Sequence, residues 1–191
     1  YHVMDVLTKR FPDVLFENCA SGGARMDAGM MYYFPQTWAS DNSDAVCRLK
    51  IQYGTSLCYP PVMTTSHISA SPNHQMLRQT PLDFRAAVSY PFNLGYELNL
   101  CKMSDEEIEK ISEQTALYKK IRPLVQGGKF YRLLSPFEGN QTAWMTVSQD
   151  EKEFLVWYYK DFADPEEAYI NVRLTGLEEK AHYQDEEGNV Y

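Results

Sequence analysis

The stretch QTWASDNSDAVCRLKIQYG, from Gln36 to Gly54, contains a strand pattern, a polar loop and a helix pattern in direct succession. We expect the strand segment, over residues 30–38, to end at Trp38. Val46, Leu49 and Tyr53 recur at helical spacing and predict a helix over residues 44–53, which Gly54 would end. This order of strand, loop and helix is typical of a parallel α/β fold.

The segments on either side follow the same order. Residues 14–16 form a brief apolar run that leads into ENCASGGARMD (residues 17–27), where paired glycines permit a close backbone approach. A short helix is expected over residues 3–11, and residues 56–62 are the next predicted strand. In a parallel sheet of this kind, ligand-binding residues are expected on the loops at the carboxyl ends of the strands.

The hydrophobic pattern of the sequence changes near residue 124, from helical spacing to short alternating segments. Ser104 and Glu107 form a capping box for a long helix that is expected to stop at Pro123. After it come short alternating segments separated by turn-rich stretches, namely KFYRLL, TAWMTVS, EFLVWYY, AYINVRL and KAHYQ. These segments predict an antiparallel β domain. The chain is therefore divided into an α/β part, residues 1–123, and an all-β part, residues 124–191.

Composition excludes several classes of function. The net charge of −8 and the lack of a clustered Lys and Arg patch argue against nucleic-acid binding. No apolar run approaches the roughly 18 residues of a membrane span. The four cysteines are scattered without a CxxC pair or a histidine at ligand spacing, so we expect no metal site, no cofactor and no disulfide framework. A reducing, cytoplasmic location fits this cysteine usage.

Two aspartates lie close together in the loop after Trp38. Asp44 stands where the helix begins, and a carboxylate in that position is favoured by the exposed amides and the helix dipole. Asp41 is not explained in this way. An aromatic plane beside a carboxylate suits a sugar site, because the ring can contact the apolar face of a hexose while the acid acts at the glycosidic oxygen. From spacing alone, a working role for Asp41 remains open.

Several long motifs resemble α-galactosidases of glycoside hydrolase family 36. The similarity runs from about Val14 to about Leu177 and includes C-x-S-G-G, W-x-S-D, SHISASPNHQ, TPLDFRAAVS and NLGYEL in the same order, then YRLLSPFEGNQTAWM. The resemblance implies the carboxyl-terminal portion of a (β/α)₈ TIM barrel, followed by an antiparallel β-sandwich domain that is incomplete here. It implies hydrolysis of terminal α-D-galactosyl residues, as in melibiose and raffinose, by a retaining mechanism.

The resemblance also assigns residues. Asp41, in W-x-S-D, would be the general acid/base, and Trp38 of the same motif would border the galactose. Cys19 and Gly22, in C-x-S-G-G, would lie against the sugar near its 2-hydroxyl. Arg25 and Asp27 are expected to pair and hold that loop.

A retaining glycosidase needs two carboxyl groups, so one aspartate is not enough. The family's nucleophile is an aspartate in a W-D motif preceded by lysine, and this sequence contains no such motif. We therefore expect the nucleophile upstream of residue 1, and we expect the isolated chain to be inactive. The resemblance further implies a homo-oligomer, commonly a tetramer, for the full-length parent.

Other interpretations stay open at the level of sequence. The same family group includes galactosyl transferases of the raffinose-synthase type, and the β domain could instead belong to a non-catalytic carbohydrate-binding module. Cys19 could be a small buried hydrophobic residue. His67 and His74 are more typical of hydrogen-bonding struts than of catalysts. Trp144 and Trp157 fit core packing on strands.

Overall fold

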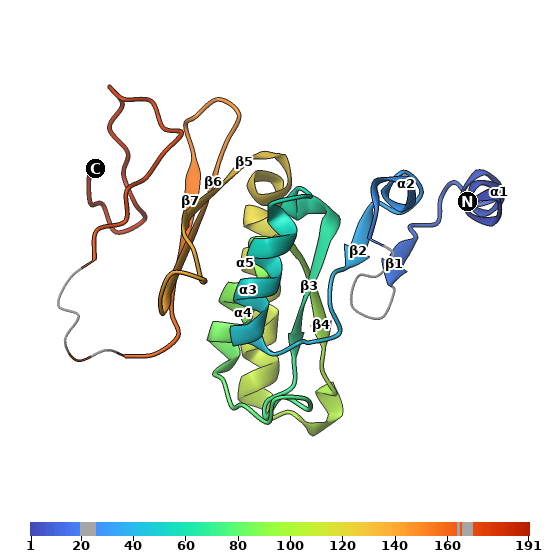
Figure 1. Ribbon diagram of the computed structural model, residues 1–191. Helices are drawn as coiled ribbons and strands as arrows, with labels where there is room; N and C mark the ends of the chain where they lie inside the picture. Colours follow the sequence, from blue (N-terminus) through green and yellow to red (C-terminus); the bar gives the residue numbers. More distant parts are fainter. Residues whose placement is uncertain (20–25, 164, 166–169) are drawn as a thin grey trace.

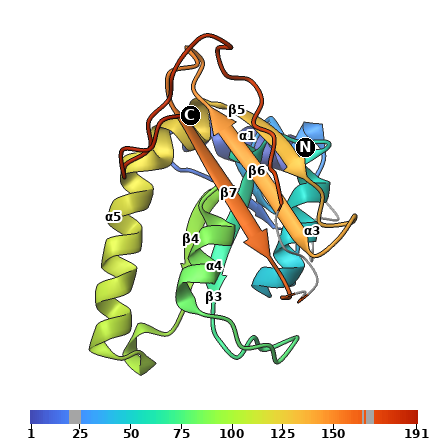
Figure 2. The ribbon, with the colours of Figure 1, turned by 90° about the vertical axis from the view of Figure 1, so that its left-hand side faces the viewer.

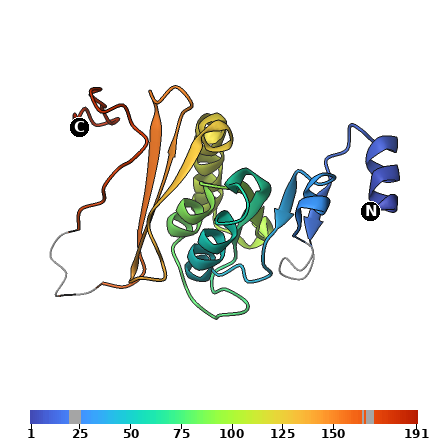
Figure 3. The same cartoon turned by 45° about the horizontal axis from the view of Figure 1, so that its top comes forward.

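The computed structural model describes residues 1–19, 26–163, 165 and 170–191. A parallel sheet and an antiparallel sheet lie on opposite sides of a helical layer (Figure 1). Three helices, α3, α4 and α5, form that layer (Figure 1), and the tilted view shows the antiparallel sheet packed on one side of it (Figure 3). The predicted combination of a parallel α/β part and an antiparallel β part is therefore confirmed at this level.

The elements have the following bounds. The α-helices are α1 (His2–Arg10), α2 (Ala28–Met31), α3 (Ala45–Ser56), α4 (Leu82–Ser89) and α5 (Asp105–Gly127), with short 3₁₀ helices η1 (Pro61–Met63) and η2 (Leu100–Lys102). The parallel strands are β1 (Glu17–Cys19), β2 (Gln36–Trp38), β3 (Thr64–Ser69) and β4 (Asn93–Glu97). The antiparallel strands are β5 (Lys129–Leu134), β6 (Gln141–Val147) and β7 (Phe154–Lys160).

The parallel sheet has the order β1-β2-β3-β4. Cys19 is the register partner of Trp38, Trp38 is the partner of Thr65, and Ser69 is the partner of Glu97. Because all four strands run the same way, their carboxyl ends lie along one edge of the sheet. The loops that follow Cys19 and Trp38 therefore start next to each other.

The largest apolar core lies between the helical layer and the antiparallel sheet. Figure 2 shows β5, β6 and β7 in front of α3 and α4. Phe92 and Trp144 are fully buried there, and their rings meet edge to face with centroids 5.5 Å apart. Leu49 of α3 and Val125 of α5 join the same cluster. Burial of these side chains holds the antiparallel sheet to the helical layer, and a smaller cluster of Ile68, Leu82 and Ala86 joins β3 to α4.

Two predicted boundaries were wrong near the end of α3. The helix continues through Gly54 to Ser56, and the strand expected over residues 56–62 begins only at Thr64. Gly54 does not take the positive φ with which a glycine usually ends a helix, so α3 continues past it. Pro60 and Pro61 follow and cannot donate to a strand ladder, so the chain makes the 3₁₀ turn η1 instead. Similarly, only Gln36–Trp38 of the predicted strand over 30–38 is extended.

The predicted stop at Pro123 was also wrong. The capping box of Ser104 and Glu107 starts α5 as predicted, but the helix runs through Pro123 and ends at Gly127. Pro123 removes one backbone hydrogen bond. Val125, beyond the proline, is buried in the Trp144 cluster, and this packing extends the last turn.

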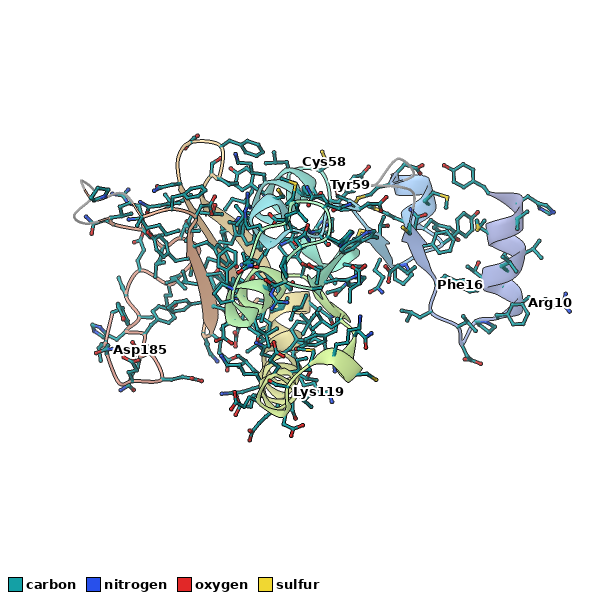
Figure 4. All side chains as sticks on the ribbon, turned by 90° about the horizontal axis from the view of Figure 1, so that it is seen from below. Arg10, Phe16, Cys58, Tyr59, Lys119 and Asp185 are labelled. Carbon is teal, nitrogen blue, oxygen red and sulfur yellow. The ribbon has the colours of Figure 1, made fainter. Side chains whose placement is uncertain are left out.

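Three of the five predicted β segments are strands, and the described residues of the last two are not. In the part of the chain that the structure describes, residues 170–174 form no strand, and residues 180–184 contribute only the bridge from Gln184 to Val190. Helix α1 lies at the other end of the molecule, where Arg10 and Phe16 are far from Asp185 (Figure 4). None of the described helices is long and apolar enough to cross a membrane.

Phe92→Ala is expected to destabilise the chain by about 3–5 kcal/mol, because the substitution leaves a cavity between the helices and the antiparallel sheet. Urea unfolding of the purified chain measures this loss. Phe162→Ala is the control, since Phe162 is 67% exposed and its truncation should change the free energy of unfolding by less than about 1 kcal/mol. Equal losses for the two variants would contradict the proposed position of the core.

Candidate active site

The predicted sugar-site residues lie along the carboxyl edge of the parallel sheet. Cys19 is the last residue of β1 and is exposed, and Trp38 is the last residue of β2 and is 8% exposed. Asp41 is an exposed residue of the loop between β2 and α3. The structure thus brings Cys19 and the start of the Asp41 loop onto neighbouring strands. Gly22 and Arg25 lie outside the described residues.

The loop from Ser40 to Asp44 is fixed by its own hydrogen bonds. The Asn42 amide donates to the Ser40 hydroxyl at 3.2 Å, and the Asp44 amide donates to Asn42 Oδ1 at 3.0 Å. Asp44 Oδ1 then accepts from the Cys47 amide at 2.9 Å and caps α3. The helix-start role predicted for Asp44 is confirmed, because its carboxylate accepts from one of the helix's unpaired amides.

The loop after β3 holds this segment from the other side. Arg78 Nη1 lies 2.7 Å from Asp44 Oδ1, and the Asp44 side chain is 1% exposed. Ser43 accepts two further hydrogen bonds. The hydroxyl of Ser69, the last residue of β3, donates to the Ser43 carbonyl at 2.9 Å, and the side-chain amide of Asn73 donates to the Ser43 hydroxyl at 3.2 Å. The Asp44 carboxylate therefore has a structural role, as a helix cap and as the partner of Arg78, whereas Asp41 is exposed.

The Trp38 ring is largely covered by two side chains. The His67 imidazole stacks on it with centroids 4.3 Å apart and an interplanar angle of 19°. The guanidinium carbon of Arg48 lies 4.5 Å from the ring centroid. Because Trp38 is only 8% exposed, a sugar could contact the uncovered part of its indole ring but not a whole face of it.

His67 has the surroundings of a packing residue. Its Nδ1 lies 3.8 Å from Glu97 Oε2, which is longer than a normal hydrogen bond. A Cβ on Gly95 would come within 2.4 Å of the imidazole, so the glycine leaves room for the ring. Burial lowers the pKa of His67 below its usual value, against the opposing effect of Glu17 and Glu97. His74, by contrast, is exposed.

Sequence reasoning missed Arg48 and Gln52. Both are buried in α3, at 1% and 0% exposure. They share a helix face with Ala45 and Leu49, which belong to the core. Two large polar residues on the core-facing side of a helix are uncommon. That pattern in the sequence could have indicated a buried hydrogen-bonded pair.

Metal chemistry was not expected from the sequence. Within residues 1–19, 26–163, 165 and 170–191, no group of three His, Cys, Asp or Glu side chains is placed to hold a metal ion. The strand ends and the following loop carry a thiol (Cys19), an aromatic ring (Trp38) and carboxyl groups (Asp41 and Glu97).

Comparison with known proteins identifies close relatives. The melibiase family model matches residues 1–128, and the glycosyl hydrolase family 36 C-terminal domain model matches residues 141–191. The chain is 52% identical over 191 residues to alpha-galactosidase AgaA of Geobacillus stearothermophilus, of which it covers 26%. It is 49% identical over 187 residues to alpha-galactosidase 1 of Pediococcus pentosaceus, of which it covers 25%.

Solved structures agree with these sequence matches. A crystal structure of an AgaA variant in complex with raffinose has a TM-score of 0.97 to this chain at 51% identity, with 100% of this chain and 27% of that chain covered. The chain spans about a quarter of the length of the relatives that it matches.

The free energy of unfolding is expected to fall as the pH drops below about 6.5, in part because of His67. The folded state lowers the pKa of His67, so the unfolded chain binds its proton first and stability is lost toward acid. His67→Phe keeps an aromatic stack on Trp38 and removes the titration. Urea unfolding between pH 5 and 8 should show a shallower pH dependence for this variant than for the wild type. An unchanged pH dependence of the free energy of unfolding would contradict the contribution of His67.

Proposed function

The chain belongs to the melibiase family of glycoside hydrolase family 36, and on this premise we propose that it is part of a retaining α-galactosidase. Its substrates would be oligosaccharides with terminal α-D-galactosyl residues, such as melibiose and raffinose. The observation that carries this proposal is the exposed Asp41 at the carboxyl edge of a parallel sheet, in a chain that matches alpha-galactosidases along its full length.

Asp41 is proposed to be the general acid/base. It would give its proton to the glycosidic oxygen as the bond to C1 breaks, and later take a proton from the attacking water. Two features support this role. The side chain is exposed on a loop that hydrogen bonds fix on both sides of it, and the nearby Asp44 is already engaged by Arg78 and the Cys47 amide.

Cys19, Gly22 and Trp38 are proposed to border the galactose. Support comes from the placement of Cys19 and Trp38 at adjacent strand ends, with Asp41 three residues beyond Trp38. With Cys19 and Gly22 proposed to lie close to the 2-hydroxyl, little room would remain for an N-acetyl group, which favours plain galactose.

The second carboxyl group is proposed to come from outside these 191 residues. A retaining enzyme holds its nucleophile about 5–5.5 Å from the acid/base. Asp5 and Asp13 precede β1, in a helix and a turn, and neither belongs to a W-D motif preceded by lysine. A nucleophilic carboxylate from another part of the protein would attack C1 while Asp41 protonates the leaving group.

The wider architecture follows from the same family membership. We propose that residues 1–123 form the last strands and helices of a (β/α)₈ barrel, and that residues 124–191 form part of an antiparallel β-sandwich. The parallel sheet with α3 and α4 on one side, followed by β5–β7, supports this division in outline, and α5 continues past residue 123 to Gly127. A cytoplasmic homotetramer is proposed for the whole enzyme.

A chimera tests the function directly. The chain would replace the matching segment of the Geobacillus stearothermophilus relative, and release of galactose from melibiose and raffinose would be measured. We expect the chimera to be active and the isolated chain to be inactive. Asp41→Asn in the chimera should lower kcat for melibiose by about 100-fold or more, the usual contribution of a general acid.

The control is Asp13→Asn, because Asp13 is also exposed but precedes β1 and so lies at the opposite end of the strand. This variant should keep the activity of the chimera. A folded chimera in which Asp41→Asn retains full activity on melibiose would contradict the acid role. Product analysis with excess acceptor sugar separates hydrolysis from transfer.

A further inference from the structure

Arg48 is a buried cation beneath the candidate site. Its side chain projects from α3 and is 1% exposed. Within the described residues, no carboxylate lies within ion-pair distance of it. Burial lowers the pKa of Arg48 to about 10, so the guanidinium is still charged at neutral pH. A buried charge without a counter-ion is costly, and its retention calls for a reason.

The guanidinium joins the loop of Asp41 to the next strand. Arg48 Nη1 donates to the carbonyl of Ser40 at 3.3 Å, and Nη2 donates to the carbonyl of Thr65 at 2.9 Å. The Ser40 carbonyl belongs to the peptide bond that leads into Asp41. The Trp38 ring lies 4.5 Å from the guanidinium carbon, so one planar group contacts the strand end, the loop and β3 together.

Gln52, one helical turn further along α3, fixes the orientation of Arg48. Its Oε1 accepts from Arg48 Nε at 3.0 Å and from the Ser66 hydroxyl at 2.6 Å. Its Nε2 donates to the carbonyl of Val88 at 2.9 Å. The Gln52 amide thus has partners on α3, β3 and α4. Because these partners fix the position of Gln52 Oε1, they also fix the orientation of the guanidinium that donates to it.

Lysine could not replace this arrangement. An ammonium group is a compact point charge, whereas the guanidinium is planar, donates in several fixed directions and can lie against an aromatic ring. The contacts of Arg48 use that geometry, because separate nitrogens reach Gln52, Ser40 and Thr65.

We propose that Arg48 is a positioning residue that acts through the Ser40 carbonyl and the Trp38 ring to hold the carboxyl group of Asp41 at the glycosidic oxygen. The inference rests on the proposed acid role of Asp41. Arg48 itself touches neither the substrate nor the reacting bond. Its loss would let the loop shift, and a displacement of about 1 Å can cost about 100-fold in rate.

The chemistry of the first step supplies a selective readout. The bond from C1 to the glycosidic oxygen breaks, its electron pair goes to the oxygen, and the nucleophilic carboxylate bonds to C1. A sugar leaving group needs the proton of Asp41 at that oxygen. A p-nitrophenolate leaving group is stable as an anion and needs little protonation. Misplacement of the acid therefore lowers kcat/KM for melibiose much more than for p-nitrophenyl α-galactoside.

The experiment compares both substrates in the chimera. Asp41→Asn and Arg48→Lys are each expected to lower kcat/KM for melibiose, by about 100-fold and by about tenfold or more respectively, with a much smaller loss for p-nitrophenyl α-galactoside. Arg132→Lys is the matched control, since Arg132 Nη1 also donates to a carbonyl of α3, that of Ser56, at 2.9 Å, but at the far end of the helix. It should change the two substrates equally and slightly.

The outcomes separate the two claims. If Asp41→Asn shows the substrate difference and Arg48→Lys lowers both substrates equally, Arg48 is only structural and the inference is overturned. If Asp41→Asn itself shows no substrate difference, the acid role fails, and the inference falls with it. Thermal unfolding of each variant establishes that the assays use folded protein.

A second variant guards against misfolding of Arg48→Lys. Gln52→Met keeps Arg48 and the size of the side chain, but removes the acceptor for Arg48 Nε. The same preference for the activated substrate is expected, at a few-fold rather than tenfold. Equal losses on both substrates from this variant would also count against the positioning role.

Discussion

The parallel pairing of β1 with β2 and of β2 with β3 is the constraint on which the candidate site depends. These pairings are short: Cys19 and Trp38, the last residues of β1 and β2, lie opposite each other, and Trp38 lies opposite Thr65, near the start of β3. Every residue proposed to act on the sugar follows or ends one of these strands. The position of Asp41 is thus set first by strand register and then by the loop that follows Trp38.

A buried polar layer beneath this edge takes the place of the usual apolar packing between a helix and a sheet. Arg48, Gln52 and Ser66 are joined by hydrogen bonds at almost complete burial. A well-packed apolar set would often be equally stable or more stable in such a place. The polar layer instead provides specific geometry, because Arg48 holds the Ser40 carbonyl and the Trp38 ring in one arrangement.

Local signals in the sequence predicted local structure well. The caps at Asp44 and Ser104, helix α1 and strands β5 to β7 follow from side chains within a few residues. The wrong boundary at Pro123 arose because packing of Val125 in the Trp144 cluster outweighed a helix-breaking residue, whereas at Gly54 the glycine keeps a helical backbone and α3 ends at Ser56. Motifs predicted Cys19, Trp38 and Asp41, whereas the contacts of Arg48 with Ser40 and Thr65 depend on tertiary structure and could not be read from spacing.

The most direct test of the account is a crystal structure of the chimera carrying Asp41→Asn with raffinose bound. If Asp41 is the general acid, the side chain at position 41 lies within about 3.2 Å of the glycosidic oxygen, the reach of such a group. The account also predicts that Arg48 still contacts the Ser40 carbonyl. A bound galactoside whose glycosidic oxygen faces a different carboxyl group, with position 41 turned toward solvent, would contradict it.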